Sequence, residues 1–214
     1  MDVAQPATGV VADAGTVAPD RAQMKTVYVL ALVSFVILPL IAYSFSGPRW
    51  GFFASFLLGG GALLTALVLM VVMFMTIPGA SRRRRVIAAV AAVFFRFGIM
   101  FLPLYFDAGY FGPAIQIAGV VAAWFFARRV STVAYPAVVV APLVYLGLEY
   151  PIDAFLRSLD LYYYSGKTTI IYAIPAALIP AIAMASAVLV GTLFARVRAS
   201  RKLSPIDPTE EAHE

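Results

Sequence analysis

The side chains of this sequence that could do chemistry are few, and several of them fall within residues 149–169, EYPIDAFLRSLDLYYYSGKTT. Glu149 and Asp153 are two carboxylates four positions apart, which would suit a metal site, proton transfer or ion pairs with a neighbouring subunit. Two carboxylates without a histidine make a poor copper or iron site. We therefore predict no catalytic or metal-binding residue. The candidates for a subunit contact or a cavity lining are Arg96, Asp107, Glu149, Asp153, Asp160 and Tyr163.

The end of this segment, SGKTT, looks like the end of a phosphate-binding loop. Such a loop needs G-x-x-x-x-G-K-[ST], because consecutive backbone amides must curl around the phosphates. The residue five positions before Gly166 is Leu161, so the first glycine is missing. We predict no nucleotide site here, and we expect Ser165 or Thr168 to cap the helix that follows.

Arg96 lies in VAAVFFRFGIM, close to the centre of an apolar stretch. An arginine at the centre of a membrane costs from about 3 to well over 10 kcal/mol, depending on the method. It should therefore face protein or a wet cavity and have an acidic partner, either Asp107, Glu149 or Asp153 or a residue of another subunit. A structural arginine that reaches toward the headgroups is the alternative. Asp107, in LYFDAGYFGP, is also explained as part of a short outer turn.

The composition places most of the chain in lipid. Of the 214 residues, 62% are hydrophobic and 13% are charged, whereas about 25% of the residues of a soluble domain are charged. The chain has no cysteine, and its one histidine is His213 in a polar C-terminal tail. The sequence thus excludes thiolate chemistry and argues against a haem or a copper site built by this chain alone.

Six apolar stretches are long or nearly long enough to cross a bilayer as helices, which takes about 20 residues. Helices are expected because they satisfy their own backbone polar groups, which lipid cannot. We predict an all-α, polytopic membrane bundle over residues 26–198, between a flexible tail at 1–25 and a cytoplasmic tail at 199–214. The six predicted spans are 27–46, 52–78, 86–106, 109–127, 133–150 and 169–195.

The basic residues indicate which ends of these spans are cytoplasmic. If the N-terminus is inside, the outer segments hold three basic residues, Arg49, Arg157 and Lys167. The inner segments then hold Arg21, Lys25, Arg82 to Arg85, Arg128, Arg129, Arg196, Arg198, Arg201 and Lys202. This excess follows the positive-inside rule and predicts cytoplasmic N- and C-termini in the cell inner membrane. Anionic lipid headgroups explain the basic stretches, so no nucleic acid is expected.

The outer loop between the last two predicted spans, at 150–168, is expected to carry a short interfacial helix. Residues 152–165 have the apolar spacing of an amphipathic helix that lies on the outer surface or forms a lid over a cavity. Pro151 should interrupt any continuous helix between Glu149 and Asp153. Trp124 falls near a span end, where aromatic rings favour the headgroup zone.

The order of features along the chain resembles a known family. A span ends in TIPGAS, the third span carries a polar residue near its centre and leads into an aromatic turn with FGP, and the fourth ends in ARRVST. The fifth ends in LVYLGLEYPIDAF, and the last reads GKTTIIYAIPAALIPAIAMASAVLVG after a tyrosine-bearing loop. Over residues 26–198 this pattern resembles the A subunit of the copper membrane monooxygenases, which include the particulate methane and ammonia monooxygenases and relatives that oxidise short-chain hydrocarbons.

The resemblance implies a membrane scaffold subunit of an enzyme that oxidises methane, ammonia or a short-chain hydrocarbon with O2. Family enzymes are trimers of three-subunit protomers, so two partner subunits are expected. Those partners hold the copper, and no cofactor is expected on this chain. The chain departs from the pattern in having six apolar stretches where the A subunit of the bacterial methane enzymes has seven spans. Its last outer loop is also shorter, which leaves the substrate open.

Two other functions fit the same observations. A non-catalytic subunit of a respiratory-type membrane complex would also explain the lack of usable histidine and a buried Arg96. A small transporter would need polar groups near the bilayer centre on broken helices, whereas the span interiors offer Arg96, Gln116 and weakly polar groups such as Thr65 and Ser186. A self-contained enzyme is not expected, because no nucleophile–base pair or metal cluster is visible.

Overall fold

The computed structural model describes residues 21–45, 51–102, 104, 108–130, 135–159 and 169–203. Those residues form helices and turns and contain no strand, which confirms the predicted all-α fold class. The helical segments in order are α1 (Arg21–Leu32), η1 (Val33–Ile37), α2 (Leu38–Ser44), α3 (Gly51–Ala54), η3 (Ser55–Gly60), α4 (Gly61–Thr76), α5 (Arg82–Arg96), η4 (Gly98–Phe101), α7 (Phe111–Ala127), α8 (Ala137–Ser158) and α9 (Thr169–Leu203).

Four helical stretches are long and apolar enough to cross a bilayer. They are Arg21–Ser44, Gly51–Thr76, Ala137–Ser158 and Ile171–Arg198. The first of them has 24 residues; at about 1.5 Å per residue such a helix reaches roughly 36 Å, more than the ~30 Å hydrocarbon layer. These stretches indicate a multi-pass membrane protein.

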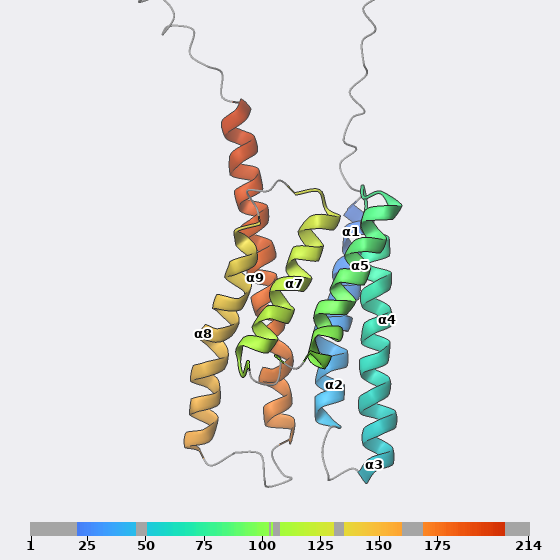
Figure 1. Ribbon diagram of the computed structural model, residues 1–214, viewed down its shortest axis with the longest axis vertical. Helices are drawn as coiled ribbons and strands as arrows, with labels where there is room; N and C mark the ends of the chain where they lie inside the picture. Colours follow the sequence, from blue (N-terminus) through green and yellow to red (C-terminus); the bar gives the residue numbers. More distant parts are fainter. Residues whose placement is uncertain are drawn as a thin grey trace, which may run out of the picture.

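The helices run alternately in opposite directions along the long axis of the bundle (Figure 1). The start of α1, the turn from α4 to α5, the end of α7 and the C-terminal part of α9 all lie toward one end (Figure 1). We call this the basic end, because its described basic residues are Arg21, Lys25, Arg82 to Arg85, Arg128, Arg129, Arg196, Arg198, Arg201 and Lys202. Both ends of the described chain therefore lie on the same side of the bundle.

The two central helices, α5 and α7, are shorter than the continuous helical stretches Gly51–Thr76 and Ala137–Ser158. They have 15 and 17 residues, and the hairpin that they form ends short of α3 and of the far end of α8 (Figure 1). The predicted helix at 86–106 thus stops at Arg96. Phe97 leaves the helical region at φ −126°, and Leu102 is extended at ψ 133°, the conformation that a following proline imposes.

Close approach of helix backbones packs α7 into the bundle. It contacts α5, α8 and α9, and most of its residues are buried. An ideal Cβ on Gly119 of α7 would lie 2.0 Å from Cγ of Phe95 on α5, and one on Gly191 of α9 would lie 2.2 Å from Cζ of Phe125 on α7. Each glycine therefore makes the space that an aromatic ring of the facing helix fills.

At the basic end, the turn between α4 and α5 is held by the residues that follow TIPGA. The Ser81 side chain accepts a hydrogen bond from the Arg84 backbone N–H at 3.4 Å and caps α5. Arg85 donates from Nε to the Ala80 carbonyl and from a terminal nitrogen to the Met75 carbonyl, both at 2.9 Å. The guanidinium thus satisfies a carbonyl at the end of α4, where helical donors are lacking. Arg85, one arginine of the SRRRR stretch, therefore stabilises the turn that connects α4 to α5.

The structure corrects the expectation of a break at Pro151. Helix α8 continues through Pro142 and Pro151 to Ser158, eight residues beyond the predicted end of the fifth span at residue 150. A proline ring displaces the carbonyl four residues earlier, which for Pro151 is that of Gly147, and an added Cβ at Gly147 would meet no atom within 4 Å. The rest of the predicted interfacial helix, from residue 160 on, lies outside the described residues.

Candidate functional site

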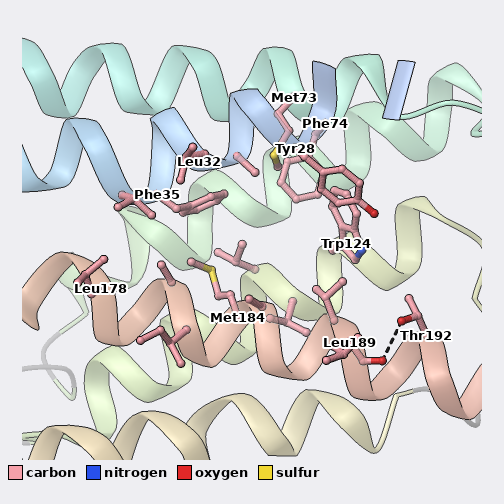
Figure 2. Close-up of a pocket in the computed structure, with 18 residues that line it drawn as sticks. Tyr28, Leu32, Phe35, Met73, Phe74, Trp124, Leu178, Met184, Leu189 and Thr192 are labelled. Carbon is pink, nitrogen blue, oxygen red and sulfur yellow. Dashed lines mark hydrogen bonds between the residues drawn. The ribbon is translucent and has the colours of Figure 1, made fainter. Parts of the chain in front are cut away.

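An apolar groove lies between the N-terminal helix and α9. Its volume is about 590 Å³, within the ~300–1,000 Å³ of sites that bind one small molecule. Residues of α4 and α7 complete its wall (Figure 2). The lining residues are Tyr28, Ala31, Leu32, Phe35, Val36, Met73, Phe74, Val120, Val121, Trp124, Leu178, Ala181, Ile182, Met184, Ala185, Val188, Leu189 and Thr192.

The groove exists because the first helical stretch diverges from α9. Its lower segments, α2 and η1, pack against α9, whereas α1 packs against α4 instead. On α9, the groove-facing residues Leu178, Ala181, Ala185 and Leu189 recur at intervals of three or four, which places them on one helix face. Two of these four are alanines, so α9 does not fill the space that the divergence leaves.

Polar atoms in the groove are confined to one end. Figure 2 shows Tyr28, Trp124 and Thr192 toward one end and Phe35 and Leu178 toward the other. The Thr192 hydroxyl donates to the Leu189 carbonyl at 2.8 Å. These residues lie on the stretches of α1, α7 and α9 that approach the basic end. The groove is therefore polar near the basic end and apolar farther from it.

Trp124 is the most buried of the polar-bearing residues in this groove. It is 7% exposed, the edge of Phe74 meets its ring, and the Arg128 guanidinium lies 5.6 Å from its ring centroid. Its indole Nε1 is buried and has no hydrogen-bond partner among the described residues. An unmet buried donor costs about 1–3 kcal/mol. The ring that the sequence places near a span end is thus packed inside the bundle, close to the basic end.

Arg96 is half-buried beside a distorted part of the first helical stretch. One of its terminal nitrogens donates to Oε1 of Gln116 at 3.2 Å, and its guanidinium lies 5.6 Å from the Phe97 ring centroid. A small cavity next to it is lined by Ser34 and Phe35 of η1, a π-helical turn, and by Pro39 of α2. Proline at 39 also removes the intrahelical donor for the Phe35 carbonyl. Single π-helical turns are frequent at functional sites, and they also re-satisfy backbone groups that a proline frees in a membrane helix.

Within the described part of the chain, the partners of Arg96 are neutral. Gln116, which accepts its hydrogen bond, is 3% exposed, and the Gln116 Nε2 has no partner among the described residues. No described hydrogen bond or ion pair joins Arg96 to Glu149 or Asp153. Asp107, the third acidic candidate, lies outside the described residues. The predicted ion pair to Glu149 or Asp153 is therefore not seen.

The carboxylates of α8 lie at the end of the bundle opposite the basic end. Glu149 and Asp153 are both partly buried and stand one helical turn apart on the same helix, because Pro151 does not interrupt it. The Tyr110 hydroxyl donates to Oδ2 of Asp153 at 2.6 Å, and Arg157 Nε donates to the same oxygen at 2.8 Å. Asp153 thus connects the start of α7 to the end of α8. Asp160 and Tyr163 lie outside the described residues.

We expect the contact between Tyr110 and Asp153 to contribute modestly to stability. A hydrogen bond to a charged acceptor contributes about 1.5–3 kcal/mol when buried, but the Arg157 side chain that shares this carboxylate is 54% exposed, which lowers the value. Tyr110→Phe and Asp153→Asn should each lower the thermal midpoint in detergent. Because both remove the same contact, the double variant should lose about 0.5–1.5 kcal/mol less than the sum of the singles. Fully additive losses would show that the two side chains act independently.

Among the described residues, no three histidine, cysteine, aspartate or glutamate side chains lie close enough together to hold a metal ion. Comparison of the chain with family models gives no match, and comparisons with curated proteins and with solved structures give none either. The arrangement of the described residues suits binding: an apolar groove with a polar end, and a cation inside the bundle that contacts neutral groups.

Proposed function

We propose that this chain is a membrane scaffold subunit of a larger complex whose chemistry is done by partner subunits. The observation that carries the proposal is Arg96, a half-buried cation inside the bundle whose described partners are an amide oxygen and an aromatic ring. A cation at membrane depth is costly unless a counter-charge or water reaches it. A carboxylate from a partner subunit supplies that counter-charge.

The proposed topology has six membrane segments and both termini in the cytoplasm, within the cytoplasmic membrane. The four long helical stretches cross the bilayer. The α5–α7 hairpin forms the proposed third and fourth crossings, with helices of 15 and 17 residues. These are shorter than the about 20 residues of a full crossing, so the residues of the turn complete the passage in this proposal. The support for the orientation is the row of arginines and lysines at the basic end.

Single cysteines test this topology directly, because the chain has no cysteine of its own. Ser158→Cys, at the end of α8, should react with a membrane-impermeant maleimide in intact cells. Ser81→Cys, at the basic end, should react only after the membrane is permeabilised. Ala108→Cys, in the α5–α7 turn, should react from outside like Ser158→Cys. Protection of Ala108→Cys would show a hairpin that turns back inside the bilayer, and labelling of Ser81→Cys in intact cells would reverse the orientation.

The more specific form of the proposal is the scaffold subunit of a copper membrane monooxygenase. Its support is the order of sequence features, from TIPGAS through LVYLGLEYPIDAF, that resembles the A subunit of that family. A chain without a usable histidine suits a subunit that leaves copper to its partners. The complex would be a trimer of three-subunit protomers that oxidises a short-chain hydrocarbon, methane or ammonia with O2.

Purification of the native complex through a tag on this chain tests both levels of the proposal. Subunit mass spectrometry after extraction in mild detergent should give two further subunits, and metal analysis should give copper in the complex. Haem in place of copper would support the scaffold role and assign the chain to a respiratory-type complex. A chain that purifies alone and without metal would contradict both levels and favour a transporter.

A further inference from the structure

We propose that the groove between α1 and α9 binds one acyl chain of an anionic phospholipid, with the lipid headgroup at the basic end. The groove is lined by carbon along most of its length, and its polar side chains, Tyr28, Trp124 and Thr192, gather at one end (Figure 2). Polarity that changes along the length of a groove matches a molecule with a head and a tail.

Basic residues of three helices lie one helical turn beyond the polar residues of the groove. Arg128, at the end of α7, lies against the ring of Trp124, with its guanidinium 5.6 Å from the ring centroid. Lys25 precedes Tyr28 by three residues on α1 and Arg196 follows Thr192 by four residues on α9, so each lies one helical turn closer to the basic end. Lys25 and Arg196 are exposed. Three cations at the mouth of an apolar groove favour an anionic headgroup over a zwitterionic one.

The unpartnered indole of Trp124 supplies a second, independent observation. Its Nε1 is buried without an acceptor among the described residues, at the polar end of the groove. Tyr28, which shares that end, is 53% exposed. The acyl chain brings an ester carbonyl to this end, and a shift of the Trp124 ring lets the indole N–H donate to it. This places the headgroup at the level of Lys25, Arg128 and Arg196.

The test uses Trp124 as the reporter. The chain has two tryptophans, so Trp50→Phe leaves Trp124 as the sole one. This variant is reconstituted into vesicles of unlabelled phosphatidylcholine. In one series the vesicles contain a rising mole fraction of brominated phosphatidylglycerol, and in the other a rising mole fraction of brominated phosphatidylcholine. Brominated acyl chains quench indole fluorescence on contact. Brominated phosphatidylglycerol should reach half-maximal quenching at a mole fraction at least roughly threefold lower than brominated phosphatidylcholine, because three cations favour the anionic headgroup.

Two sets of variants separate the groove from the rest of the bundle surface. Ala185→Phe fills the groove and should abolish the difference in half-maximal mole fraction between the two brominated lipids. Ala154→Phe, at an exposed alanine of α8 outside the groove, should preserve that difference. Lys25→Gln with Arg196→Gln changes only exposed side chains. This pair should bring the two half-maximal fractions to within about twofold of each other.

Equal quenching by both brominated lipids would overturn the proposal, as would a lipid preference that Ala185→Phe leaves intact. Quenching that occurs in the isolated chain but not in the purified native complex would assign the groove to a helix of a partner subunit and would also overturn it. The outcome does not depend on copper or on the identity of any partner. It is therefore separate from the test of the scaffold function.

Discussion

Gly191→Ala is expected to destabilise the bundle by about 1–3 kcal/mol, the usual cost of overpacking a well-packed core. The added Cβ would lie 2.2 Å from Cζ of Phe125, which is fully buried. Gly119→Ala creates a closer contact, 2.0 Å from Cγ of Phe95, the ring atom bonded to Cβ, which moves only with a new rotamer or a backbone shift. We therefore expect a loss at least as large at Gly119.

The thermal midpoint of the purified protein in mild detergent measures both effects. Gly147→Ala is the matched control, because an added Cβ there meets no atom within 4 Å. It should be neutral or should stabilise α8 by up to about 1 kcal/mol, the difference in helix propensity between alanine and glycine. Phe125→Leu in the Gly191→Ala background should restore part of the loss. If Gly191→Ala and Gly147→Ala had the same midpoint, the close packing of α7 against α9 would be disproved.

The contact between Gly191 and Phe125 also matters for the groove. Val188, Leu189 and Thr192 of α9 line the groove beside Gly191, and Trp124 of α7 lines it beside Phe125. A wall formed by two helices keeps its shape only while those helices stay in contact. The same substitution that lowers stability should therefore also weaken binding of any ligand in the groove.

Hydropathy predicted where the helices lie, and backbone chemistry decided where they end. The predicted span at 52–78 corresponds to helical residues 51–76, and the last helix begins at the predicted residue 169. The third span ended early because Phe97 and the residue before Pro103 leave helical geometry. The fifth span extended past residue 150 because helix α8 continues through both Pro142 and Pro151. Hydropathy does not indicate where the backbone leaves helical geometry or whether a helix continues through a proline.

The candidate site was predictable only where it depends on near neighbours in the chain. Arg96 and Gln116 were both noted as polar residues inside spans, and they lie almost symmetrically about the α5–α7 turn. An antiparallel hairpin brings such residues opposite each other, so their contact follows from the predicted spans. The groove could not be predicted from the spans, because it depends on how α1 diverges from α9, and these two helices lie at opposite ends of the sequence. For Trp124, the sequence indicated only an aromatic residue near a span end, and not that its ring lines a groove.

Arg96→Leu should have opposite effects on the isolated chain and on its assembly. In the isolated chain, Arg96 contacts neutral groups among the described residues, and a cation at membrane depth costs at least about 3 kcal/mol on insertion scales. The loss of one hydrogen bond to Gln116 costs about 1 kcal/mol. The purified chain alone should therefore keep or raise its thermal midpoint, whereas the yield of partner subunits on the tagged chain should fall at least roughly tenfold, the factor that corresponds to ~1.4 kcal/mol.

Three further variants decide whether the counter-charge comes from a partner subunit. Arg96→Lys keeps the charge and should restore part of the partner yield, while Arg82→Leu, which removes an exposed arginine at the basic end, should leave the yield unchanged. Asp107→Asn is the critical comparison, because Asp107 is the acidic candidate outside the described residues. If Asp107→Asn and Arg96→Leu both lower the midpoint of the isolated chain and spare assembly, then Arg96 pairs within this chain. If only Arg96→Leu affects assembly and the isolated chain is not destabilised, then the carboxylate belongs to a partner, and a cation that is costly in the free subunit favours formation of the complex.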